Sequence, residues 1–103
     1  MNLNKLMKQA QKMQEKMAQT QSELAEKTVE AQAAGGKITV VANGAGDVIS
    51  IKIAKEIVDP EDVEFLEDAL LSGVKQAIEQ GKAIASSEMS KITGGMGMPG
   101  LGQ

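Results

Sequence analysis

The chain has 103 residues, a length that suits one domain and leaves no room for two full hydrophobic cores. Its formal net charge is −3. It contains no histidine and no cysteine, the usual general base, thiolate nucleophile and transition-metal ligands, so the composition argues against an enzyme. We expect no cofactor, no metal and no small-molecule substrate. The sequence has no run of 18 or more apolar residues and no secretory signal, which predicts a cytoplasmic protein without a membrane span.

The opening residues predict a long amphipathic helix over about 3–33, ended by Gly35 and Gly36. Its narrow apolar stripe follows heptad spacing on a mostly polar helix, and such a helix needs a partner to be stable. We interpret the stripe as a packing or dimer seam, an interpretation favoured over a ligand groove. Its members are Leu3, Leu6, Met7, Ala10, Met13 and Met17.

A second stripe on the same predicted helix is basic. Its members lie within ~80° of one another and more than ~100° from the apolar centre. Two interpretations are open, an ordinary solvated face or a surface that meets phosphate groups. Glu23, Glu26 and Glu30 continue the same face, so basic and acidic blocks are expected to be separated along the helix. The basic residues are Lys5, Lys8, Lys12 and Lys16.

Residues 37–53 predict an antiparallel β-hairpin. Two β-branched runs flank the turn sequence NGAGD at 43–47, whose Asn and Gly residues tolerate positive φ. The second run alternates, and we expect Ile49, Ile51 and Ile53 to face inward. The lone G-x-G of the turn lies in a hairpin and not between a strand and a helix, so nucleotide binding is not expected.

A second long helix is predicted to start at Asp59 as N-cap, with Pro60 as its first residue, and to end at about residue 92. Asp59, Glu61 and Asp62 are explained by capping and the helix dipole, with a hard cation as the less favoured alternative. A row of small residues follows at spacings of four. We expect a partner helix to pack there, with a hinge as the alternative. The row is Gly73, Ala77, Gly81 and Ala85.

Two long helices joined by a hairpin predict an antiparallel arrangement. Lys82 and Lys91 would then share an end of the molecule with the lysines of the first helix, opposite the acidic stretch 56–68. The exposed apolar stripe predicts a twofold dimer. We expect one domain over 1–93 and a flexible tail over 94–103.

Four segments, in order along nearly the whole chain, resemble the YbaB/EbfC family of bacterial nucleoid-associated proteins. This resemblance implies an α+β subunit that forms an intertwined, tweezer-like homodimer, with paired helices projecting from a central sheet. It also implies binding of double-stranded DNA in the nucleoid, with little sequence preference, through the projecting helices. The segments are LMKQAQKMQEKM, NGAGDVISIKI, LEDALLSGVKQAIEQ and KITGGMGMPGLG.

Together these features predict a homodimer that organises or bridges DNA. We assign DNA binding mainly to phosphate contacts, because lysine lacks the bidentate fork of arginine. Helix or dimer packing is assigned to Leu6, Met13, Met17, Gly73, Ala77 and Gly81. The alternative is a dimeric protein-interaction adapter that does not bind DNA. The predicted DNA-contacting residues are Lys5, Lys8, Lys12, Lys16, Lys82 and Lys91.

Overall fold

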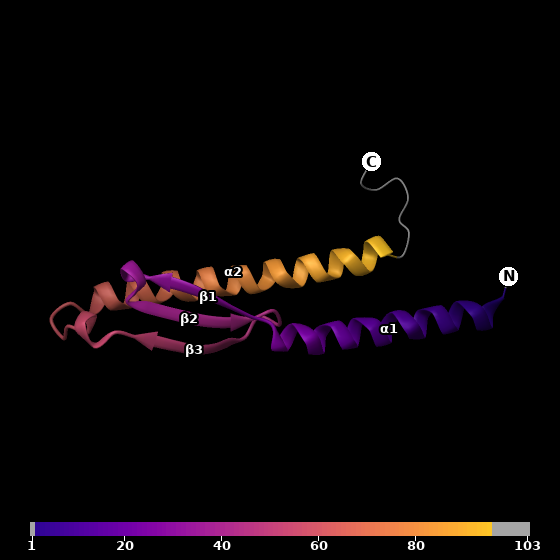
Figure 1. The fold of residues 1–103 in the computed structure, drawn as a ribbon, viewed down its shortest axis with the longest axis horizontal. Coiled ribbons are helices and arrows are strands. Elements are labelled where there is room, and N and C mark those ends of the chain that lie inside the picture. Colours follow the sequence, from indigo (N-terminus) through magenta and orange to yellow (C-terminus); the bar gives the residue numbers. More distant parts are fainter. Residues whose placement is uncertain (1, 96–103) are drawn as a thin grey trace.

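A computed structural model describes residues 2–95 and has the predicted α+β fold, with a long helix at each end of a three-stranded antiparallel sheet (Figure 1). The predicted tail over 94–103 falls mostly on residues 96–103, which lie outside the described residues. The elements are α1 (Leu3–Glu26), β1 (Thr28–Ala33), β2 (Ile38–Asn43), β3 (Val48–Ile53) and α2 (Val63–Gly95), with short 3₁₀ turns at Ala34–Gly36 and Lys55–Ile57.

The molecule is elongated, with extents of 71 × 29 × 16 Å. Its radius of gyration is 19.7 Å, whereas a compact chain of this length has about 13 Å. The start of α1 and the end of α2 point toward the same end, as the antiparallel arrangement predicts (Figure 1). The hairpin and the start of α2 lie at the other end.

The predicted first helix is too long. It ends at Glu26, and Lys27 already has an extended backbone with φ −87° and ψ 122°. Residues 28–33 instead form β1, which pairs with β2 so that Ala31 lies opposite Val40 in the core. Pairing with the sheet therefore overrides the helix propensity of this segment, as tertiary contacts often do. Glu30 consequently belongs to a strand and not to the acidic face of α1.

The glycine pair after this segment makes a turn between strands and does not end a helix. Ala34, Gly35 and Gly36 all have positive φ, at 53°, 65° and 89°. Three left-handed residues in succession reverse the chain from β1 into β2, and glycine adopts that conformation at the lowest cost. The two glycines, which were expected to end a helix, therefore form the turn between β1 and β2.

The predicted hairpin is present as β2 and β3, with an irregularity between Val41 and Ala42. Ile51 lies opposite Val40, and Ile53 lies opposite Ile38, so these isoleucines share a face with the core of β2. That face is uncovered at β3, because α2 packs over β1 and β2. Ile49, Ile51 and Ile53 are 54%, 43% and 37% exposed, so the expectation that they are buried within the chain is wrong.

The small-residue row of α2 packs against the sheet and not against another helix. A Cβ at Gly73 would lie 3.0 Å from Cγ2 of Val40, and a Cβ at Gly81 would collide with the carbonyl oxygen of Asn43. Ala77 is fully buried. The expected close approach is thus present, but its partner is the sheet. The buried core consists of Ala31, Ile38, Val40, Ala42 and Ala77.

The start of α2 also differs from the prediction. Its N-cap is Asp62, whose Oδ1 accepts a hydrogen bond from the N–H of Phe65 at 3.3 Å. Asp59 caps the preceding turn, accepting from the N–H of Glu61 at 2.9 Å. The helix therefore begins at Val63, three residues after Pro60, and runs to Gly95.

Candidate nucleic-acid interface

Within the described residues, α1 is anchored mainly at its C-terminal end. Thr20 and Leu24 are its buried residues. The backbone N–H of Gly44, in the hairpin turn, donates to the carbonyl oxygens of Leu24 and Lys27, both at 2.9 Å. Lys27 also forms an ion pair with Glu88 of α2. The anchor therefore combines one buried leucine, backbone hydrogen bonds and an interhelical ion pair.

The remainder of α1 projects beyond α2. The Lys27–Glu88 contact sets the two helices side by side at those residues. From there, Leu3 lies about 36 Å along α1, whereas Gly95 lies only about 10 Å along α2. The first helix thus extends past the described end of the second (Figure 1). We call residues 3–17 the α1 tip.

Four lysines line the α1 tip, and we call them the tip lysines: Lys5, Lys8, Lys12 and Lys16. All four residues are exposed. Within the described part of the chain, none of their ammonium groups pairs with a carboxylate. Over residues 3–20 they are accompanied by one acid, Glu15, so this segment carries a net charge of +3 (four minus one). The structure therefore presents free positive charge over about 17 Å of helix.

The apolar stripe of the tip runs along a different side of α1. Leu6 falls at the same helical angle as the buried Leu24, and Met13 and Met17 fall within ~20° of it. Met13 is half-buried, while Leu6 and Met17 are exposed. The stripe that packs at the base thus continues uncovered to the tip, about 120° around the helix from the tip lysines.

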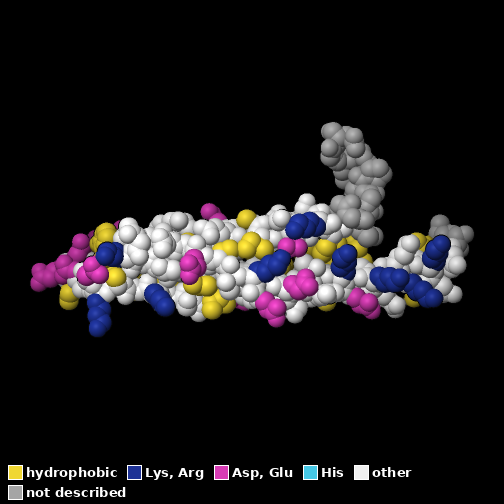
Figure 2. Space-filling view, viewed as in Figure 1, with side chains coloured by type: hydrophobic (Ala, Val, Ile, Leu, Met, Phe, Trp, Pro, Cys, Tyr) yellow, Lys and Arg dark blue, Asp and Glu magenta, His cyan; other side chains and the backbone are white. Residues whose placement is uncertain are grey.

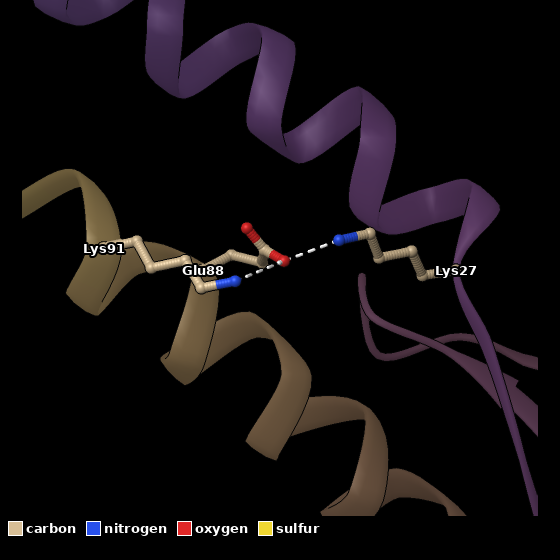
Figure 3. A network of polar contacts seen from close by, with 3 residues as sticks. All are labelled: Lys27, Glu88 and Lys91. Carbon is tan, nitrogen blue, oxygen red and sulfur yellow. Dashed lines mark hydrogen bonds and ion pairs between the residues drawn. The ribbon is translucent and has the colours of Figure 1, made fainter.

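Lys82 and Lys91 do not join the tip lysines. Lys91 lies near the base of α1, where its ammonium is 3.8 Å from a Glu88 carboxylate oxygen that also pairs with Lys27 (Figure 3). Lys82 is one residue past Gly81, which contacts the hairpin turn. Both lysines are exposed, but they lie beside the anchored part of α1.

Glu88 links the two helices electrostatically. Its side chain is only 24% exposed. The hydrogen bond from Lys27 and the positive charges of Lys27 and Lys91 hold the pKa of the Glu88 carboxyl below its usual value. The carboxylate is therefore stabilised in its charged form at the point where α1 leaves the body of the molecule.

Charge is separated along the long axis of the molecule. Figure 2 shows acidic side chains crowded at the end that holds the start of α2, with a few lysines among them, and lysines along the projecting part of α1 at the other end. One of the lysines at the acidic end, Lys37, pairs with Glu56. The acidic end corresponds to residues 56–68, which contain seven acids and no lysine. A polyanion would be attracted to the α1 tip and repelled from the opposite end.

The residues that hold α1 in place are not apparent from the sequence. Leu24 is buried at the end of α1. Asn43 is expected from the sequence only to form the turn, yet its side chain donates to the carbonyl oxygen of Ala25 at 3.1 Å. The Asn-Gly pair signals the turn, but no pattern in the sequence signals which helix end that turn contacts.

The described residues contain no group of acidic side chains arranged to hold a metal ion. Asp59 and Asp62 accept hydrogen bonds from backbone N–H groups, which accounts for their positions. Among the described helices, none combines the length and the hydropathy needed to cross a membrane.

The fold and the charged tip define an elongated α+β protein with a lysine-bearing helix that projects from a small sheet. Comparison with known proteins places it more narrowly. The sequence profile described as the YbaB/EbfC DNA-binding family matches residues 1–96. The chain belongs to the YbaB/EbfC DNA-binding family, as the resemblance indicated.

Curated relatives agree with this assignment. A nucleoid-associated protein of Clostridium kluyveri is 52% identical over 100 residues, covering 97% of this chain and 88% of the relative. A nucleoid-associated protein of Alkaliphilus metalliredigens is 53% identical with the same coverage. The crystal structure of an uncharacterized protein from Helicobacter pylori shares the fold, with a TM-score of 0.65, 18% identity and coverage of 78% of this chain and 93% of that one.

Proposed function

We propose that this protein is a nucleoid-associated homodimer in the cytoplasm that binds double-stranded DNA through the tip lysines and thereby organises or bridges DNA. The observation that carries the proposal is the set of four exposed lysines, without an ion pair among residues 2–95, on a helix that projects beyond the described end of α2. Membership of a DNA-binding family and the names of the relatives support it.

The chemistry of the tip favours phosphate contacts over base recognition. Lysine offers a flexible point charge that meets phosphate oxygens, whereas base recognition relies on bidentate groups such as arginine. The chain contains no arginine that could supply such a group. Phosphate contacts position a protein on DNA but carry no direct sequence information, so we propose binding with little sequence preference.

The homodimer is supported by apolar surface that one chain leaves uncovered. Ile49, Ile51 and Ile53 extend the core face of the sheet beyond α2. A standard interface buries about 800 Å² on each partner. A second copy, which offers the same uncharged face, would cover these isoleucines in a twofold arrangement.

Two copies would present eight tip lysines, four from each subunit. Binding that neutralises several phosphates releases counterions, so the affinity falls steeply with salt. A pair of projecting helices could hold one duplex between them, or each helix could bind a separate duplex. In the latter arrangement the dimer would bridge DNA. Lys82 and Lys91, which lie away from the tip, would contribute less to affinity than the tip lysines.

The test is a titration of a labelled 30-base-pair duplex, followed by fluorescence anisotropy at several salt concentrations between about 50 and 200 mM. The wild type should bind with a steep salt dependence. Replacement of Lys5, Lys8 and Lys12 by glutamate should abolish binding while leaving the dimer intact, because these residues lie beyond the anchored part of α1. The oligomeric state is measured in parallel by sedimentation.

The matched control replaces Lys82 and Lys91 by glutamate and should retain most of the affinity. Absence of wild-type binding at low salt would refute the proposal. Binding that hardly responds to salt would favour the adapter alternative, in which the exposed Leu3 and Met7 of the tip dock a protein partner.

A further inference from the structure

The contact between the hairpin turn and the end of α1 has a role beyond making the turn. We propose that Asn43 is a positioning residue that sets the direction in which α1, and with it the tip lysines, projects. This inference rests on the proposed function for its consequence in DNA binding, but the geometry that it describes can be measured without DNA.

The Asn43 side chain joins two elements that are otherwise separate. Its Oδ1 accepts hydrogen bonds from the backbone N–H groups of Ala45 and Asp47, at 3.0 and 2.9 Å, which closes the turn. Its Nδ2 donates to the carbonyl oxygen of Ala25 at 3.1 Å. Asn43 is 4% exposed. One buried amide therefore forms the turn with its oxygen and holds α1 with its nitrogen.

The carbonyl that Asn43 binds belongs to the last turn of α1. The last four carbonyl groups of a helix lack a partner within the helix, so contacts to them come from outside and also define where the helix end sits. The carbonyl of Leu24 is likewise bound by the Gly44 N–H. Beyond these contacts, α1 has few restraints, because Thr20 and Leu24 are its only buried residues in the described chain.

The turn is held tightly from both sides. A Cβ at Gly44 would lie 2.8 Å from Cδ2 and 3.0 Å from the carbonyl oxygen of Leu24, so the turn touches α1 directly. On the other side, the absence of a side chain at Gly81 of α2 leaves room for the Asn43 carbonyl oxygen. The turn is thus enclosed between α1 and α2. Through its contacts with both helices, Asn43 links the position of α1 to that of α2.

Small changes at this contact have large effects at the tip. Leu3 lies about 33 Å along the helix from Ala25, so a rotation of 10° at the base moves the tip by about 6 Å. That displacement is about half the width of the DNA major groove, which is about 12 Å. An α1 that samples several directions would spend less time in the one that places all tip lysines on phosphates.

The test replaces only the donor, with Asn43→Asp. The carboxylate keeps an acceptor for the turn, and Asp-Gly suits a tight hairpin turn as Asn-Gly does, but an oxygen now faces the Ala25 carbonyl. The matched control is Ala45→Asp, which adds the same charge in the same turn at an exposed side chain. Both variants are checked for secondary structure by circular dichroism and for dimerisation by sedimentation.

The direction of α1 is measured by electron paramagnetic resonance. The chain has no cysteine, so spin labels at Gln9→Cys and Ser86→Cys report only the distance from tip to α2. An excess of unlabelled protein isolates distances within one chain. We expect a narrow distribution for the wild type and for Ala45→Asp, and a broad or shifted one for Asn43→Asp. If one tenth of the molecules keep the competent direction, DNA affinity falls about tenfold.

An unchanged, narrow distribution in a folded Asn43→Asp variant would overturn the proposal. If that variant does not fold, Gly44→Ala takes its place. Gly44 is not among the positive-φ residues, so alanine fits the backbone while its methyl pushes against Leu24, and the same broadening or shift is expected. Loss of the fold in both variants would also overturn the proposal, because the contact would then be needed for folding itself. Failure of the wild type to bind DNA would refute the proposed function. The distance measurement would still test whether Asn43 sets the direction of α1, because it requires no DNA.

Discussion

At the scale of single residues, the small side chains of α2 determine how closely the helix approaches the sheet. The spacing of Gly73, Ala77 and Gly81 correctly predicted a close approach, because mid-helix glycines are costly unless something packs against them. The partner was predicted wrongly. Helix periodicity reveals which face of a helix carries small side chains, but either a strand or another helix can pack against such a face.

This packing makes a prediction that separates two glycines. Gly81→Ala should lower the free energy of unfolding by about 1–3 kcal/mol, because the new methyl meets the backbone carbonyl of Asn43, which cannot move aside easily. Gly73→Ala should cost less, since its methyl meets the Val40 side chain at 3.0 Å and helix propensity improves by about 1 kcal/mol.

Urea unfolding of both variants at one protein concentration measures the difference, because the stability of the proposed dimer would depend on concentration. A Gly81→Ala variant as stable as the wild type would show that the turn yields, and the described enclosure of Asn43 would then be wrong.

At the scale of elements, the junction between α1 and α2 is sensitive to pH through Glu88. Its lowered pKa means that the folded state binds a proton less readily than the unfolded state. The stabilisation is therefore complete above the ordinary glutamate pKa of about 4.3 and is lost as the pH falls through the lower value of the folded protein.

We accordingly expect Glu88→Gln to lower the urea midpoint at pH 7, and the difference from the wild type to shrink toward pH 3. The effect at pH 7 should be small, since the lysines of this ion pair are largely exposed. Glu79→Gln, an exposed position on the same helix with no ion pair in the described chain, is the control and should show no such pH-dependent difference. A difference that stays constant from pH 7 to pH 3 would exclude the ionised carboxylate as its source.

At the scale of the whole molecule, the proposed dimer depends on the uncovered face of β3. Ile51→Glu should convert the dimer into a monomer, because a charge at the centre of an apolar interface is left without a partner. Ser50→Glu is the matched control, since it places the same charge on the opposite face of the same strand. Sedimentation velocity at micromolar concentration distinguishes the two. Dimers of equal stability in both variants would move the interface away from β3.

The elongated shape keeps the basic and acidic regions of the molecule far apart. A compact chain with the same composition would average its charges over a small surface, and a net charge of −3 would then argue against DNA binding. Here the tip lysines lie on the projecting end of α1. The acidic stretch 56–68 lies at the other end, so the sign of the local charge, and not the net charge, decides where DNA is attracted.

The sequence by itself determined the α+β class, the two long helices, the hairpin and the separation of lysines from apolar residues on α1. Each of these depends on local periodicity and turn chemistry, which a single sequence displays directly. The family followed from the order of four segments, and the family comparison confirms it. The tip lysines were also identified from the sequence, and their contact with DNA remains a prediction.

Only the tertiary structure decided that residues 28–33 form a third strand, that α2 packs on the sheet and that Asn43 holds the end of α1. It also placed Lys82 and Lys91 beside the anchored part of α1, where Lys91 shares the Glu88 carboxylate with Lys27. These features depend on pairings between residues far apart in the chain, such as Ala31 with Val40 and Ala25 with Asn43. Such pairings leave no periodic signal, since they are selected by burial and hydrogen bonding in the folded molecule.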